Sequence, residues 1–258
     1  MTALARSRIT LALLVFGSVI SGTLLIPMLR PFMAERAPGN ESATHAFMAL
    51  GLLGAVVASP FVGRLARLVR STTRLAVAAA VLDALLLGSL SVGSGLPLLL
   101  ALRALQGALN LTVISLLLGA APVSNRKHLG AHFGILGTAM MLGVALGAPL
   151  GTLCLRLGTT GPLLVGASVE LLVAALAPLV GLQTPARHAQ SVQWAALPWL
   201  AMLWVFAERT AVGLFVVTFA FHAKGCLGLS DAQYGLAIGA FMLPFVLAVY
   251  PAGQLADR

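Results

Sequence analysis

The hydrophobic positions of this chain form long uninterrupted runs that are separated by short polar segments. Eight runs approach or reach the length needed to cross a bilayer: 9–29, 46–63, 75–94, 97–121, 133–154, 161–182, 197–220 and 233–252. A helix of about 20 apolar residues spans the roughly 30 Å hydrocarbon core. Strands of a membrane barrel would be shorter and would alternate polar with apolar residues. The pattern therefore predicts an all-α integral membrane protein with eight transmembrane helices.

A polar stripe interrupts the apolar run at 97–121. Arg103, Gln106 and Asn110 are three and four residues apart, so they share one face of the predicted helix with Gly107. An arginine at this depth is costly unless it faces a partner or a water-filled cavity. Two interpretations stay open: Arg103 holds two helices together, or the stripe belongs to a polar path through a helical bundle.

The composition agrees with a membrane location, and the charge distribution predicts the topology. The chain is 59% hydrophobic and 9% charged, whereas about a quarter of a soluble domain is charged. One side of the predicted spans carries Arg6, Arg8, Arg64, Arg67, Arg70, Arg74, Arg126, Lys127, Arg187 and Arg258, and the other carries Arg30, Arg36, Arg156 and Lys224. This asymmetry follows the positive-inside rule and predicts a cytoplasmic N-terminus. We therefore attribute the net charge of +9 to topology and expect no nucleic-acid partner.

Residues that commonly bind metals or carry catalysis show no functional spacing. Cys154 and Cys226 have no metal-like spacing, and His128 and His132 lack the glutamate of an HExxH zinc motif. Neither a GxSxG motif nor a glycine-rich nucleotide fingerprint occurs. We expect no metal, no cofactor and no enzymatic activity, with an intramembrane hydrolase as a disfavoured alternative.

A short pattern recurs at an offset of 190 residues. Residues 63–67 (GRLAR) and 253–257 (GQLAD) each end an apolar run, and Pro60 and Pro251 precede them. Parallel repeats of six spans are a transporter architecture with a substrate site between the halves. The predicted division is 1–182 for an N-terminal six-helix half, 183–196 for a cytoplasmic loop and 197–258 for the start of a second half.

The fifth of these runs has glycines at every fourth position. Gly143, Gly147 and Gly151 leave one helix face without side chains, so a neighbouring backbone can approach closely. Pro149 removes a backbone donor between them and favours a kink. Static packing and a moving hinge are both open interpretations of this face.

Motifs at four places resemble those of the major facilitator superfamily. Residues 253–258 (GQLADR) resemble its G-x-L-A-D-R-x-G-R-R loop motif, and residues 63–74 resemble a degenerate first copy with Arg67 in place of the aspartate. Residues 102–107 (LRALQG) and 143–151 (GVALGAPLG) are similar to its fourth-span R-x-x-Q-G motif and its exporter-associated fifth-span motif. Residues 22–29 also resemble first spans of multidrug and sugar efflux members. The loop-motif residues are Gly63, Arg67, Arg70, Gly253, Asp257 and Arg258.

Four further ionisable residues fall inside predicted spans: Asp83, Glu170, Glu208 and Arg209. The resemblance implies that the first, fourth, seventh and tenth spans line a cavity. It therefore favours Arg103, Gln106, Asn110, Glu208 and Arg209 as transport or coupling residues. Asp83 and Glu170 lie on more peripheral spans, where a structural or secondary coupling role is expected, and either acid could pair with Arg103. Glu208 is the predicted proton carrier.

The resemblance implies a transporter of the major facilitator type in the cell (inner) membrane. We expect a monomer that exports a small, partly apolar compound by proton-coupled alternating access, with lipid, substrate and protons as its partners. An uptake symporter of the same fold and a non-transporting membrane scaffold or relic are the alternatives. The repeat offset also leads us to expect four further spans beyond Arg258.

Overall fold

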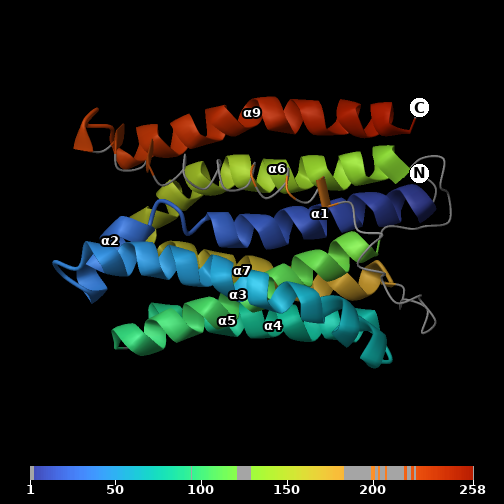
Figure 1. The fold of residues 1–258 in the computed structure, drawn as a ribbon, viewed down its shortest axis with the longest axis horizontal. Coiled ribbons are helices and arrows are strands. Elements are labelled where there is room, and N and C mark those ends of the chain that lie inside the picture. Colours follow the sequence, from blue (N-terminus) through green and yellow to red (C-terminus); the bar gives the residue numbers. More distant parts are fainter. Residues whose placement is uncertain are drawn as a thin grey trace.

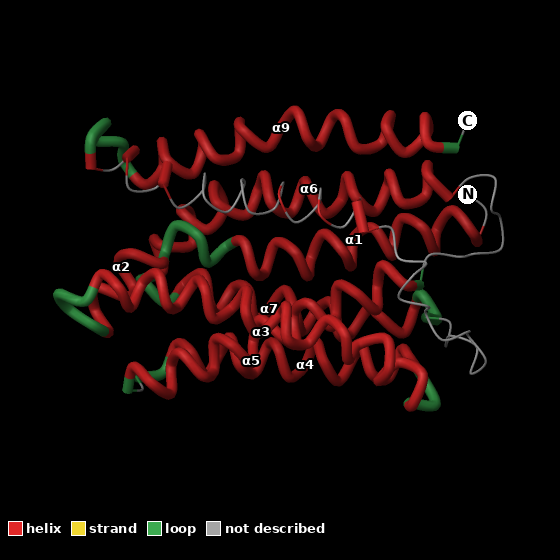
Figure 2. Tube along the Cα trace, in the orientation of Figure 1, coloured by secondary structure: helices red, strands yellow, loops and turns green. Residues whose placement is uncertain are grey.

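The computed structural model describes residues 3–93, 95–120, 129–182 and 225–257, together with isolated positions between 199 and 223. Regular secondary structure within these residues is helical. The elements are α1 (Ala3–Thr23), α2 (Leu29–Arg36), α3 (Glu41–Leu68), α4 (Thr72–Ser91), α5 (Leu96–Gly119), α6 (Leu129–Cys154), η2 (Leu155–Leu157), α7 (Gly161–Leu176), η3 (Ala177–Leu179) and α9 (Asp231–Ala256). The long helices run side by side along the longest axis (Figure 1), and the loops that the structure describes between them are short and lie at the helix ends (Figure 2).

The described part of the chain contains 6 helices that are long and apolar enough to cross a membrane. They correspond to α3, α4, α5, α6 extended by η2, α7 extended by η3, and α9, and the apolar part of α1, Arg8–Thr23, is shorter. These helices confirm the predicted all-α membrane bundle. Most of the run at 197–220 lies outside the described residues, so the total of eight spans stays a prediction.

The first helix ends earlier than the apolar pattern predicts. The pattern extends this span to residue 29, whereas α1 ends at Thr23 and the chain turns before α2 begins at Leu29. Pro27 accounts for the break, because proline lacks a backbone N–H and disfavours helical geometry in the residue before it. Phe32 and Met33 are buried and lie on the inward-facing side of α2.

The helix at the second predicted span is longer than the apolar run that predicts it. The pattern predicts 46–63, whereas α3 covers Glu41–Leu68. The Asn40 side chain accepts a hydrogen bond from the backbone N–H of Ala43 at 3.1 Å and so caps the helix start. Hydropathy does not register these added turns, because their residues include charged and polar side chains.

The helices pack in an order that places α1 between two groups. Figure 1 shows α9, α6 and α1 in succession, with α7 and α3 next and α5 and α4 beyond them. α9 packs along α6, α1 contacts α6, α7 and α5, and α5 packs on both α3 and α4. The largest hydrophobic core joins α1, α4, α5 and α7 through residues that include Leu14, Ala80, Val113, Leu117 and Val173. The buried polar residues described below lie among the same four helices.

Glycines bring α3 and α5 into close contact. A Cβ atom added at Gly54 would lie 1.8 Å from the carbonyl oxygen of Ala104, and one added at Gly107 would lie 1.9 Å from the carbonyl oxygen of Gly51. No side chain fits at either position without moving a backbone. The close contact holds Arg103 against α3, since its guanidinium lies beside Gly51.

The face of α6 that carries Gly143, Gly147 and Gly151 packs against α1. A Cβ atom at Gly147 would lie 1.9 Å from Oγ1 of Thr23, and one at Gly151 would lie 2.3 Å from the carbonyl oxygen of Leu24. Oγ1 of Thr23 donates a hydrogen bond of 2.9 Å to the carbonyl oxygen of Gly143. The side-chain-free face therefore accommodates the backbone of α1.

The other side of α6 packs against α9. A Cβ atom at Gly130 would lie 2.2 Å from the carbonyl oxygen of Gly253, and one at Gly239 would lie 3.1 Å from Cγ of Pro149. The glycines and proline of α6 thus contact two neighbours, α1 on one side and α9 on the other.

Both chain termini lie at the same end of the bundle, and the α3–α4 turn lies at that end as well (Figures 1 and 2). The charge pattern also places the basic residues near both termini and those between α3 and α4 on one side of the membrane. We predict that this end faces the cytoplasm.

A labelling experiment tests the predicted orientation. With Cys154 and Cys226 replaced, a single cysteine at Asn40 should react with an impermeant maleimide on intact cells. A single cysteine at Ser71 should react only after the cells are opened, because it lies beside Arg70 and Arg74 on the side that the positive-inside rule places in the cytoplasm. Labelling of Ser71→Cys alone on intact cells would reverse the orientation.

Candidate functional site

The polar stripe of α5 is the starting point of a buried hydrogen-bond network. Arg103, Gln106 and Asn110 lie on one face of this helix, as their spacing predicts. The Nη1 atom of Arg103 donates a hydrogen bond to Oε1 of Gln106. Gln106 is 1% exposed, and its amide turns from α5 toward α4.

Asp83 on α4 receives donors from two residues of this stripe. Nε2 of Gln106 donates to Oδ1 of Asp83 at 2.8 Å. Nδ2 of Asn110 donates to Oδ2 at 3.1 Å. Asp83 is 0% exposed, so these two hydrogen bonds replace the water that a carboxylate would otherwise bind. The link from Arg103 to Asp83 therefore passes through Gln106.

Glu170 on α7 closes the network from the opposite side. Nδ2 of Asn110 lies 3.3 Å from Oε1 of Glu170. The Oγ atom of Ser21 donates to Oε1 at 2.7 Å, and the Oγ atom of Ser18 lies 3.4 Å from Oε2. Glu170 is also 0% exposed. One amide, Asn110, thus contacts both buried carboxyl groups.

The network reaches the edge of the described bundle on the α5 side. Ser18, Ser21, Asp83 and Glu170 are all 0% exposed. Arg103 and Asn110 are half-buried. The guanidinium of Arg103 also lies over the ring of Phe47 on α3, 5.3 Å from its centroid, a cation–π contact. Within this network, Arg103 and Asn110 are therefore more exposed than the two carboxyl groups.

The structure brings five of the predicted site residues together and leaves two undescribed. Arg103, Gln106, Asn110, Asp83 and Glu170 form one connected set. The remaining two, Glu208 and Arg209, lie outside the described residues. The expectation that Arg103 pairs with a buried acid is met only indirectly, because no direct ion pair with either acid occurs within the described residues.

Sequence reasoning missed the serines that bind Glu170. Ser18 and Ser21 are three residues apart in an apolar run, so both lie on one face of α1. That spacing was a usable signal. The sequence did not show which helix this face would meet.

The second loop motif makes a specific contact at the end shared by the termini. The carboxylate of Asp257 accepts hydrogen bonds from the backbone N–H groups of Gly130 at 2.6 Å and Ala131 at 2.8 Å. These N–H groups belong to the first turn of α6, where a negative charge is stabilised by free donors and by the helix dipole. Gly253 lies close enough to Gly130 that neither position has room for a side chain. The motif therefore fastens α9 to the start of α6.

The first loop motif makes no comparable hydrogen bond to any other described part of the chain. Gly63, Arg67 and Arg70 are exposed at the end of α3, and an added Cβ atom at Gly63 would meet nothing within 4 Å. Arg67 occupies the position that corresponds to Asp257 in the second loop motif. Arg258 lies outside the described residues.

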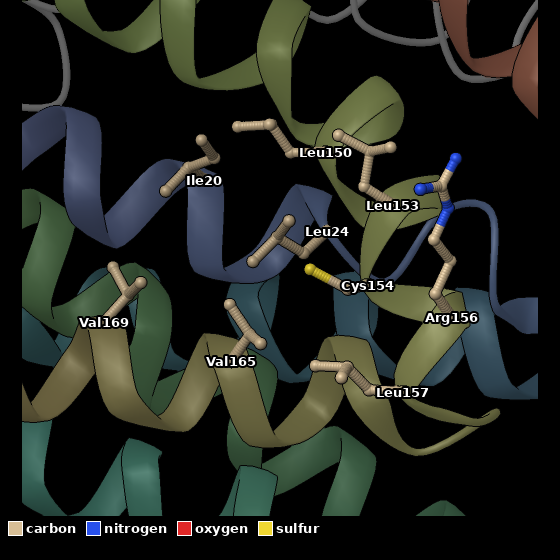
Figure 3. Close-up of a pocket in the computed structure, with 9 residues that line it drawn as sticks. All are labelled: Ile20, Leu24, Leu150, Leu153, Cys154, Arg156, Leu157, Val165 and Val169. Carbon is tan, nitrogen blue, oxygen red and sulfur yellow. The ribbon is translucent and has the colours of Figure 1, made fainter.

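Two apolar pockets lie apart from the polar network. The pocket in Figure 3, of about 440 Å³, is lined by aliphatic residues of α1, α6 and α7, with Cys154 and Arg156 toward one end. A second pocket, of about 680 Å³, lies between α1, α6 and α9 and is lined by residues that include Phe16, Thr138 and Tyr250. Among the residues that the structure describes, no carboxyl group lines either pocket. Within the described residues, no cluster of histidine, cysteine or acidic side chains could hold a metal ion.

Six span-length helices, tight glycine contacts and a buried polar network define a multi-pass helical membrane protein. The Major Facilitator Superfamily model matches residues 11–223. This match covers most of the chain, which therefore belongs to the major facilitator superfamily and is a membrane transporter of that type. The family consists of transporters rather than enzymes, and a small-molecule substrate follows from it. No curated protein matches the chain.

Proposed function

We propose that this protein exports a small, partly apolar compound by alternating access and that proton movement in the opposite direction drives the export. The observation that carries the proposal is the connected set of Arg103, Gln106, Asp83, Asn110 and Glu170 inside an apolar bundle. Ionisable residues within membrane spans are costly and typically mark ion or substrate pathways. Two buried acids offer protonation sites on that pathway.

The pocket between α1, α6 and α9 supports a partly apolar substrate. Aliphatic and aromatic side chains dominate its described lining, whereas Thr138 supplies an oxygen atom that has no hydrogen-bond partner among the described residues. A compound with an apolar body and one hydrogen-bond donor matches this lining. In the proposed second half of the repeat, which begins near residue 197, α9 is the described helix that faces this pocket.

The packing of α6 supports a movement between halves. α6 belongs to the proposed first half and packs against α9 of the proposed second half, so the contact between these two helices is the boundary along which the halves would slide. The Asp257 contacts at the start of α6 would hold one end closed, and their release would open it. Glu208, the proton carrier that the sequence predicts, lies outside the described residues and stays a prediction. The proposed setting is a monomer in the cell inner membrane with its N-terminus in the cytoplasm.

A flux assay in proteoliposomes tests the direction and the coupling. A thermal-shift screen of the purified protein first selects a stabilising compound, which is then used as the transport probe. Vesicles that enclose the dye pyranine report proton movement while an imposed pH gradient drives the probe. Export by antiport predicts that probe and protons cross in opposite directions. Movement in the same direction would favour an uptake symporter, and no probe movement from any stabilising compound would favour the scaffold interpretation.

A further inference from the structure

We propose that Asp83 and Glu170 hold a single proton between them, carried on Glu170, and that this pair binds the proton that drives transport. The first part concerns the resting protein alone. The second part rests on the proposed function.

Both carboxyl groups lie within hydrogen-bonding distance of one side-chain amide, that of Asn110. Nδ2 of Asn110 lies 3.1 Å from Oδ2 of Asp83 and 3.3 Å from Oε1 of Glu170. Both acids are 0% exposed, so bulk solvent does not screen their charges from each other. Two like charges this close, in a medium of low dielectric, strongly oppose each other.

The charged side chains that the described residues place around the pair balance one negative charge. From α5, Arg103 contributes one positive charge, and Gln106 and Asn110 contribute neutral amides. From α1, Ser18 and Ser21 contribute neutral hydroxyls. Within the described residues, no other charged side chain makes a hydrogen bond to this network. One bound proton therefore brings the cluster to neutrality.

The hydrogen bonds indicate which acid carries the proton. Asp83 accepts from an amide on each oxygen, which satisfies an ionised carboxylate. In Glu170, Oε1 accepts from Ser21 at 2.7 Å, whereas the only partner that the described residues give Oε2 is Ser18 Oγ, at 3.4 Å. A proton on Oε2 can be donated to the Ser18 oxygen, because a serine hydroxyl both donates and accepts. The structure thus favours ionised Asp83 and protonated Glu170.

This assignment connects proton binding to the helix that contacts α6. Ser18 lies on α1, the same helix whose Thr23 donates to the Gly143 carbonyl of α6. Loss of the proton would turn the Ser18 hydroxyl from acceptor to donor and would leave Glu170 charged beside Asp83. The repulsion would then act between α4 and α7, the helices that carry the two acids, with α1 packed against α7.

Infrared spectroscopy of the purified protein tests the shared proton. The wild type should show the absorption band of a buried protonated carboxyl group at neutral pH. Glu170→Gln should lose this band because the proton carrier is gone. Asp83→Asn should also lose it, because Glu170 is then the remaining acid of the pair and its negative charge alone balances Arg103. Glu41→Gln, the same substitution at an exposed glutamate, is the matched control and should retain the band.

Two results would overturn the shared proton. They are the absence of the band in wild type and its persistence in Glu170→Gln.

Thermal unfolding of the same variants gives a second readout, because each single amide variant keeps one acid for Arg103 and should fold. The double variant leaves Arg103 without an acid and should be less stable than either single variant. If Glu170→Gln and Asp83→Asn both lose the band as expected, but Glu170→Gln still accumulates the probe against its gradient, the proposed coupling role is wrong.

Discussion

Replacing Gly54 with alanine should lower the unfolding temperature of the detergent-solubilised protein sharply and should remove much of its folded yield. The added methyl group would lie 1.8 Å from the carbonyl oxygen of Ala104, a backbone atom that cannot move without displacing α5. Overpacking of this kind typically costs about 1–3 kcal/mol and occasionally more. Contact with a backbone atom places this site at the upper end of that range.

Gly88→Ala is the matched control for this prediction. Gly88 also lies within a span-length helix, α4, but an added Cβ atom there would meet nothing within 4 Å. Alanine has the higher helix propensity, by about 1 kcal/mol, so the control should be neutral or slightly stabilising. Equal unfolding temperatures for the Gly54 and Gly88 variants would show that α3 and α5 are not held as closely as described.

Replacing Arg103 with alanine should reduce pH-driven transport about tenfold or more, because a hydrogen bond from a charged group contributes about 1.5–3 kcal/mol. The change removes the only cation that the described residues place in the network, together with the donor to Gln106. The measurement is the initial rate of probe movement in proteoliposomes, normalised to folded protein. The protein should still insert and fold, since protonation of the second acid can restore neutrality.

Arg103→Lys separates charge from geometry. Lysine keeps the positive charge but lacks the planar fork of donors, so it should restore charge balance and only part of the transport rate. Loss of folded protein in both variants, with normal specific activity in the fraction that folds, would instead assign Arg103 a purely structural role.

The fold was largely predictable because uninterrupted apolar runs of about 20 residues indicate membrane-spanning helices. Its errors have local causes: Pro27 breaks the first span, and the polar turns around Asn40 extend the second helix beyond its apolar run. The glycine face of α6 was visible as a pattern, but its partner α1 was not. The contact of Gly54 with α5 was invisible, since one sequence does not show how two helices are rotated against each other.

The candidate site was predictable as a set of residues and not as a network. Helical spacing placed Arg103, Gln106 and Asn110 on one face without any further information. The assignment of Asp83 and Glu170 to peripheral helices suggested a secondary role for them. The structure places both acids around Asn110, because α4, α5 and α7 converge at that depth.

The most direct test of proton coupling through this network compares two activities of Glu170→Gln in the same proteoliposomes. One is exchange of the selected probe across the membrane without a pH gradient, and the other is its accumulation when a pH gradient is imposed. Glutamine imitates protonated Glu170 in shape but cannot release a proton. We predict that exchange continues and that pH-driven accumulation is lost. Accumulation by Glu170→Gln at the wild-type level would contradict the account.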